Sequence, residues 1–192
     1  MAIITAMRGL RRLPVLVVPL VALALLAAGC GGGGGSSTQA MSAADWATGV
    51  CSAVSTWKTD VTSAVNSLKG GNLSESSAKS AASSVENATS TLESDLKNLG
   101  KPNTSSGDKA QQSVQSLTSS LDSGKSSIKS DMDSASGVSG TLSAASSAAS
   151  TLSTMSQQVS STISDLRSID AKGELGSAFQ QSSACQSLKS GS

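Results

Sequence analysis

The chain has 192 residues, a formal net charge of +1 and neither histidine nor tyrosine. Without histidine, imidazole acid–base catalysis, histidine-dependent triads and histidine-ligated metal sites are excluded. Beyond Arg12 the chain carries ten lysines and Arg167 against thirteen acidic residues, and such a slightly acidic balance attracts neither nucleic acid nor an anionic lipid surface.

Residues 1–29 have the layout of a secretory signal peptide. Arg8, Arg11 and Arg12 precede an apolar run from Val15 to Leu26, and small residues follow it. The run from Val15 to Leu26 has only twelve residues and is interrupted by Pro19, whereas a transmembrane helix needs about 20. We therefore expect a cleaved leader that uses the general secretion route.

The five residues from Leu26 to Cys30 read LAAGC and resemble the lipobox of bacterial lipoproteins. In that family the leader is cut before the cysteine and the thiol carries a diacylglyceryl group, so the resemblance implies lipidation of Cys30. The alternative is an unmodified Cys30 after an ordinary cleavage site. Gly31–Gly35 begins a flexible tether over residues 30–41. The Gly/Ala/Ser bias is similar to that of small lipoproteins from high-GC Gram-positive bacteria.

The remaining sequence shows helical periodicity despite a composition that is close to that of disordered chains. About a quarter of the sequence is serine, and large aliphatic residues are sparse after the leader. Apolar residues nevertheless recur every three or four positions from Trp46 to Leu68, Leu73 to Leu99, Ala110 to Ala135 and Leu142 to Ile169. This spacing predicts four amphipathic helices.

The borders of these stretches carry helix start and stop signals. Segments 42–45 (SAAD) and 72–75 (NLSE) predict N-terminal capping boxes for the first two helices. Segment 100–102 (GKP) stops the second helix, and the glycines of segment 137–140 (GVSG) divide the third from the fourth. A short fifth helical segment follows Gly173.

Four helices of about 27 to 30 residues, roughly 42 Å each at 1.5 Å per residue, predict an all-α fold. Short turns between them favour an up-and-down antiparallel four-helix bundle over residues 42–192, with the short helical segment at its C-terminal side. Alanine and serine let helices approach closely but bury little area. We therefore expect a thin core that benefits from a covalent staple.

The cysteines Cys51 and Cys185 supply that staple, because an exported domain with two remaining cysteines commonly joins them. An even number of long antiparallel helices brings both chain ends to one pole, whereas three helices would separate them by about 40 Å, far beyond the roughly 5.5 Å that a disulfide permits between Cα atoms. The alternative is two isolated thiols. Phe179 is expected to pack at the same pole.

Candidate catalytic groups are weak. Asp131 with Asp133 and Glu93 with Asp95 are two residues apart, which on a helix turns the carboxylates away from each other. The Ser-x-x-Lys element of penicillin-binding enzymes recurs, as expected by chance in a serine-rich chain, for example at Ser55, Ser76, Ser94 and Ser126. The sequence predicts no enzyme, no cofactor and no metal site.

Trp46 and Trp57 lie eleven residues apart and so share one helix face. They are interpreted either as core anchors or as a solvent-facing pair that binds a partner, since tryptophan is enriched at binding hot spots.

Taken together, the sequence predicts a non-catalytic lipoprotein on the outer face of the cytoplasmic membrane. It is held there by its lipid anchor, with an envelope protein as its expected partner and no nucleic acid. Two alternatives are a serine-rich surface spacer and a helical ligand-sensing domain that uses a groove near Trp46 and Trp57.

Overall fold

The computed structural model describes residues 41–69 and 74–190. The predicted signal peptide (1–29), the lipidation site Cys30, all of the predicted tether (30–41) except Met41, and Asn72 lie outside the described residues. Among the residues that the structure describes, no helix combines the length and the apolar character that a membrane crossing requires.

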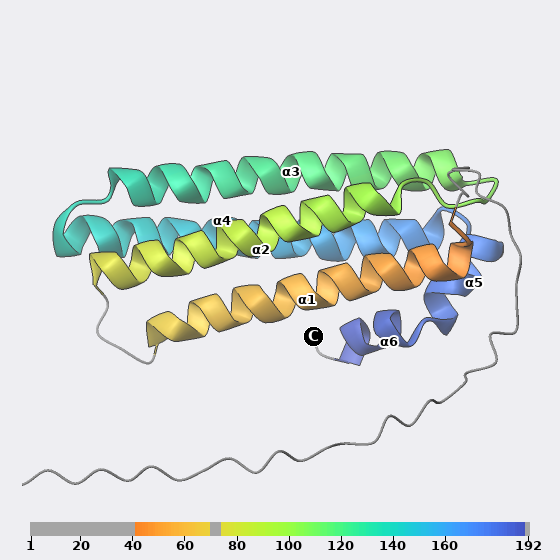
Figure 1. Ribbon diagram of the computed structural model, residues 1–192, viewed down its shortest axis with the longest axis horizontal. Helices are drawn as coiled ribbons and strands as arrows, with labels where there is room; N and C mark the ends of the chain where they lie inside the picture. Colours follow the sequence, from red (N-terminus) through yellow and green to blue (C-terminus); the bar gives the residue numbers. More distant parts are fainter. Residues whose placement is uncertain (1–40, 70–73, 191–192) are drawn as a thin grey trace, which may run out of the picture. The chain divides into compact units, whose positions relative to one another are not determined.

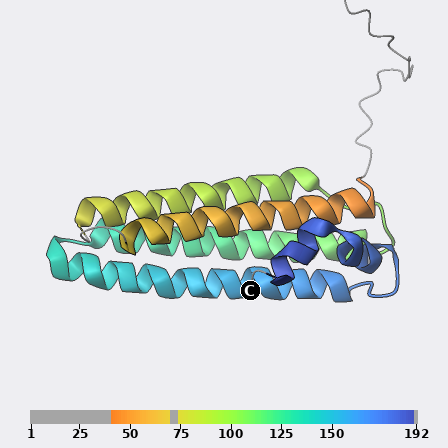
Figure 2. The same cartoon turned by 90° about the horizontal axis from the view of Figure 1, so that it is seen from below.

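The described part of the chain is helical, as predicted. Its helices are α1 (Ala43–Lys69), α2 (Glu75–Leu99), α3 (Gly107–Ser134), α4 (Gly137–Ser168), α5 (Glu174–Gln181) and α6 (Ser183–Ser190). The four long helices lie side by side, and each runs opposite to the one before it (Figure 1). Near one end of the long helices, α5 packs against α1 and α4, and α6 packs against α1 (Figure 2).

The starts of the first two helices follow from serine caps. The Ser42 hydroxyl accepts a hydrogen bond from the Asp45 backbone N–H at 3.1 Å, which confirms the predicted cap of α1. The prediction that segment 72–75 caps the second helix is wrong by two residues. Ser74 is the N-cap of α2, because its side chain accepts from the Ser77 N–H while the Ser77 hydroxyl accepts from the Ser74 N–H. These reciprocal bonds satisfy donors that a helix start otherwise leaves unpaired.

Two glycines with positive φ end one helix and begin another. Gly100, at φ 60°, terminates α2 as the sequence predicts. Gly137, at φ 65°, begins α4 only three residues after α3 ends at Ser134. The prediction that the whole segment 137–140 separates the two helices is therefore wrong. The left-handed conformation, which glycine adopts without steric cost, makes the turn in fewer residues.

This earlier start of α4 also changes which side chains face the core. Val138 and Leu142 lie one turn apart on the outer face and are 81% and 59% exposed. Thr141 and Ala144 face inward instead and are buried. The prediction that Leu142 opens the apolar stripe of this helix is therefore wrong, since the helical register set from Gly137 turns Leu142 toward solvent.

The predicted fifth segment is two helices rather than one. The extended backbone of Ser182 (φ −67°, ψ 120°) breaks it between α5 and α6. The Thr48 hydroxyl of α1 donates to the Ser182 hydroxyl at 3.2 Å. The break lets α6 turn back along α1.

Candidate functional site

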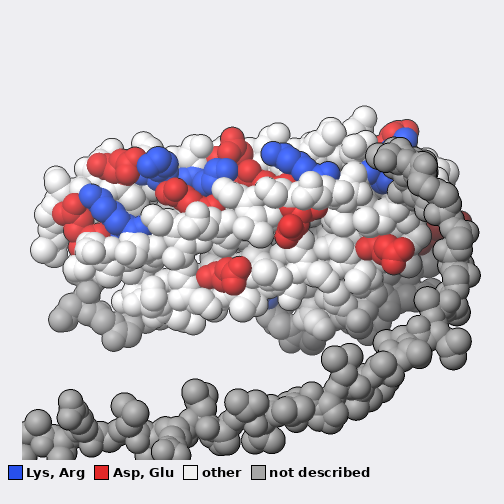
Figure 3. Space-filling view, viewed as in Figure 1, with Lys and Arg blue, Asp and Glu red and all other residues white. Residues whose placement is uncertain are grey.

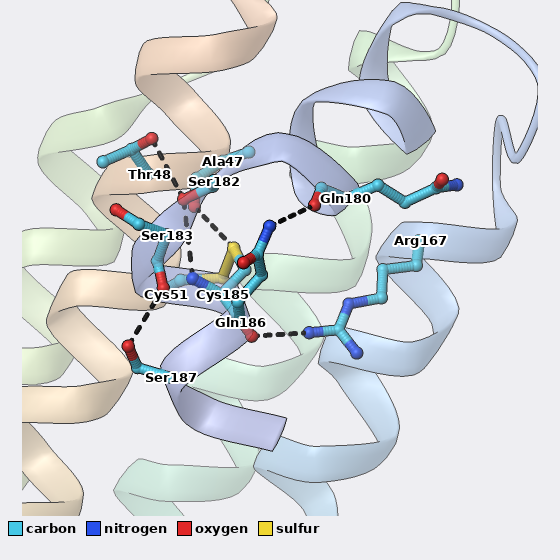
Figure 4. The surroundings of a disulfide bond; sticks show 10 residues. All are labelled: Ala47, Thr48, Cys51, Arg167, Gln180, Ser182, Ser183, Cys185, Gln186 and Ser187. Atoms are coloured by element: carbon cyan, nitrogen blue, oxygen red, sulfur yellow. Dashed lines mark hydrogen bonds between the residues drawn. A yellow bond between two sulfur atoms is a disulfide. The ribbon is translucent and has the colours of Figure 1, made fainter. Parts of the chain in front are cut away.

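A disulfide joins α1 to α6. Cys51 and Cys185 are both fully buried, their Cα atoms are 5.0 Å apart, and 134 positions separate them in the sequence. The predicted pairing is therefore present in the structure. Figure 4 shows its surroundings, in which Arg167 of α4 donates through Nη2 to the Cys185 carbonyl at 3.3 Å. The disulfide therefore holds α6 against α1, and the Arg167 hydrogen bond links α6 to α4.

The chain enters the helical domain at the same end. The Met41 carbonyl accepts a hydrogen bond from the Asn103 N–H at 2.9 Å, so the residue before the α1 cap is held against the loop between α2 and α3. Beside it, the Trp46 indole donates to the Gly100 carbonyl at 3.0 Å. Two separate parts of the sequence, residues 41–46 and 100–103, therefore meet at this end.

Trp46 and Phe179 form the centre of that end. Their rings meet edge to face, with centroids 6.1 Å apart and an angle of 87° between the planes. Both side chains are buried. Phe179 thus packs at the pole of the disulfide, as predicted, and the aromatic pair attaches α5 to α1 through a geometry that the ring quadrupoles favour.

Trp57 lies about halfway along α1, on the same buried face. It is 4% exposed, and its indole donates to the hydroxyl of the buried Thr89 at 3.2 Å. With the indole N–H groups of Trp46 and Trp57 both bonded inside the domain, the structure places both in the core. The interpretation of the two residues as a solvent-facing pair that binds a partner is wrong. Both rings lie on the buried face of α1 and pack against neighbouring helices.

A cavity of about 170 Å³ lies between α1, α4 and α6, and Trp57 forms part of its wall. Five apolar side chains, two serines and two cations form its walls: Val54, Trp57, Lys58, Ser156, Val159, Ser160, Ile163, Arg167 and Leu188. None of these nine residues is acidic. The cavity is therefore lined by both apolar and polar groups, and the charged residues among these nine are both cations.

Arg167 is the feature of this recess that sequence reasoning missed. It lies in the last turn of α4, where a cation interacts favourably with the helix dipole. Its Nε is buried without a hydrogen-bond acceptor, and the side chain forms no ion pair with any described residue. The available signal was that Arg167 is the sole arginine after Arg12, in a chain that otherwise uses lysine.

Several carboxylates form ion pairs along the helices. Figure 3 shows acidic and basic side chains interspersed on one face, with no large area of either sign. Lys79 pairs with Glu75 at 2.7 Å and Lys129 with Asp133 at 2.9 Å. Among the described residues, no three His, Cys, Asp or Glu side chains gather as a metal site would require.

Glu93 is buried, which its spacing from Asp95 did not indicate. Its side chain is 8% exposed and accepts from Lys125 of α3, whose ammonium also contacts Asp122 at 3.0 Å. Burial lowers the pKa of Lys125, but the hydrogen bonds and charges of Asp122 and Glu93 outweigh it and raise the pKa above its ordinary value. This trio joins α2 to α3 and leaves the lysine protonated.

Comparison of the chain with family models, with curated proteins and with solved structures finds no match. The lipobox resemblance covers only the residues up to Cys30 and assigns no role to the helices. The function of the helical domain is therefore inferred from its staple, its buried aromatic side chains and its cavity.

Proposed function

We propose that the protein is an exported lipoprotein anchored through Cys30 to the outer face of the cytoplasmic membrane. In this proposal residues 42–192 form an up-and-down antiparallel four-helix bundle that acts as a non-catalytic interaction or envelope-associated module. The observation that carries the proposal is the buried disulfide Cys51–Cys185. Disulfides of this kind persist in oxidising compartments outside the cytoplasm, which agrees with the leader in residues 1–29.

The position of the staple supports the anchored arrangement. Met41 meets the helical domain at the end where Trp46 and Phe179 pack beside the disulfide. A tether that arrives at this end attaches to the part of the domain that is closed covalently. Fluctuations at the anchor are then resisted by a buried disulfide rather than by a fraying helix end.

The state of the serine hydroxyls supports a non-catalytic role. Several of them, such as Ser84, Ser94 and Ser123, donate to the carbonyl four residues earlier in the same helix. This local bond satisfies the hydroxyl within its own helix. It also orients these hydroxyls along the helix and away from any shared site.

The capped helices and the buried core favour a folded module over a serine-rich spacer. Ser42 and Ser74 cap their helices, and two tryptophans and a phenylalanine are buried. An unfolded spacer would not need a disulfide between two cysteines that are 134 positions apart in the sequence.

The test is membrane attachment of a Cys30→Ala variant in the producing bacterium. We expect the wild-type protein to fractionate with membranes and mass spectrometry to find a diacylglyceryl group on an N-terminal Cys30. The Cys30→Ala variant should lose this attachment, whereas the matched control Ser37→Ala in the tether should keep it. An unmodified Cys30 in the wild-type protein, or equal membrane attachment of both variants, would refute the anchor.

A further inference from the structure

The cavity beside Trp57 has the size of a small ligand. Its volume is about 170 Å³, and an apolar protein cavity of about 150 Å³ accepts a benzene molecule. Trp57 and Val159 form part of its wall, and Leu188 of α6 borders it. The recess thus offers apolar contact to a body no larger than one aromatic ring or a short branched chain.

The polar part of the cavity lining favours a negatively charged ligand. Lys58 comes from α1 and Arg167 from α4, so two helices present one cation each to the same recess. The hydroxyl-bearing residues Ser156 and Ser160 also line it, and none of the lining residues that the structure describes carries a negative charge. A guanidinium and an ammonium in the lining of one cavity complement a carboxylate, which accepts charge-assisted hydrogen bonds from both.

Arg167 has hydrogen-bonding capacity beyond what the protein uses. One terminal nitrogen donates to the Cys185 carbonyl, as drawn in Figure 4, while Nε is buried without an acceptor. A buried donor without a partner costs about 1–3 kcal/mol, more for a charged group. A side chain needed only to hold α6 would be served by the single bond to Cys185.

From these observations we propose that the cavity between α1, α4 and α6 binds a small carboxylate with an apolar body. The body lies against Trp57 and Val159, and the carboxylate pairs with Arg167 and Lys58. Leu188 borders the bound body, and the disulfide holds α6 over it. The site does not depend on the lipid anchor proposed above, so either proposal can fail alone.

The experiment compares phenylacetate with 2-phenylethanol, which has the same ring and no charge, by calorimetric titration of the purified protein. We expect phenylacetate to bind at least tenfold more tightly and to change Trp57 fluorescence. Arg167→Gln should reduce its affinity at least tenfold, to the level of the alcohol. Lys97→Gln, which removes a cation outside the cavity, should leave the affinity unchanged.

Two further variants keep the test decisive if Arg167→Gln loosens α6. Lys58→Gln removes the other cation and should weaken phenylacetate binding without affecting the alcohol. Ser160→Phe fills the recess and should abolish binding of both probes, while circular dichroism shows that the helices persist. Equal affinity for the two probes would overturn the ligand class, and absence of binding at millimolar concentration, or binding that survives Ser160→Phe, would overturn the site.

Discussion

The two ends of the helical domain are packed with different side chains. The disulfide end, around Cys51–Cys185, contains Trp46, Phe179 and Leu175, all of them fully or almost fully buried. The opposite end, called here the alanine end, surrounds a cavity of about 70 Å³ lined mainly by small side chains: Ala64, Val65, Leu68, Ala78, Ala81, Ala82, Val85, Ile128, Met132, Ala145, Ala148, Ala149 and Leu152. Large side chains are used where the short helices α5 and α6 cover the long ones.

This difference shows how a serine- and alanine-rich chain can be more stable at one end of its helical domain than at the other. Each buried large side chain contributes about 1.5–3 kcal/mol, whereas alanine contributes little burial and loses no side-chain entropy. The exposed Val138 and Leu142 add nothing to the core of the alanine end. The disulfide end should therefore be the more stable half, and the alanine end should exchange its amide hydrogens sooner.

The largest effect should come from removing the staple. The double substitution Cys51→Ala with Cys185→Ala opens a loop of 134 positions, and we expect it to lower the free energy of unfolding by up to about 4–5 kcal/mol. Urea unfolding measures this change. Hydrogen exchange should locate the loss of protection in α5 and α6 rather than in α2 and α3.

Reductant provides the control for this prediction. It should lower the unfolding midpoint of the wild-type protein and leave that of the double variant unchanged. Equal midpoints for the reduced and oxidised wild-type protein would show that the disulfide end does not depend on its covalent bond.

The next largest effect should come from Phe179. Replacing Phe179 by alanine removes the ring that meets Trp46 and leaves a cavity, so we expect a loss of about 3–5 kcal/mol. The matched substitution Leu142→Ala, at the exposed start of α4, should change the free energy of unfolding by less than about 0.5 kcal/mol. Similar losses for the two variants in thermal unfolding would contradict the contrast between the ends.

An intermediate effect is expected between the two ends, at Glu93. Glu93→Gln weakens the buried pair with Lys125 and should cost about 1–2 kcal/mol. Because the folded state raises the pKa of Lys125, its stabilisation is complete below the ordinary pKa of 10.5 and is lost as the pH rises through the higher folded value. Unfolding midpoints measured at increasing alkaline pH should therefore fall less steeply for Glu93→Gln than for the wild-type protein.

Glu174→Gln is the control for that comparison, because Glu174 is exposed in the first turn of α5. It should keep the wild-type dependence on alkaline pH. A Glu93→Gln protein with the same pH dependence as the wild type would show that the Lys125 pair does not stabilise the fold.

The smallest effect, and one of opposite sign, is expected at the alanine end. Ala145 lines the small cavity and is half-buried, so Ala145→Leu can fill part of the space and should raise the free energy of unfolding by about 0.5–1.5 kcal/mol. Ala44→Leu, at an exposed position of α1, tests for a general gain from leucine and should have no such effect. Destabilisation by Ala145→Leu would mean that the alanine end is already closely packed.

Capping and stop signals within a few residues predicted much of this fold. The errors in the prediction also come from signals of this short range. Ser42 and Gly100 were identified correctly because a cap or a stop depends on a few neighbouring residues. The start of α2 at Ser74 was missed because several serines compete for the same role. The turn before Gly137 was placed too late, since one left-handed glycine suffices to reverse the chain direction.

The candidate site was less predictable. The disulfide followed from residue counts and helix number, but the cavity beside Trp57 did not. Its walls come from α1, α4 and α6, and Arg167 is 18 positions away from the Cys185 carbonyl that it contacts. No pattern within one helix indicates which of its cations will line a cavity that is formed together with other helices.

The sequence by itself determined the long helices, some of their ends and the pair of cysteines available for a staple. These properties follow from periodicity, capping and composition, which act over a few residues. Only the tertiary structure decided that Glu93 meets Lys125 and that Arg167 lines a cavity with Trp57. Those contacts depend on how each helix is rotated and shifted against its neighbours, which the packing of all the helices sets together.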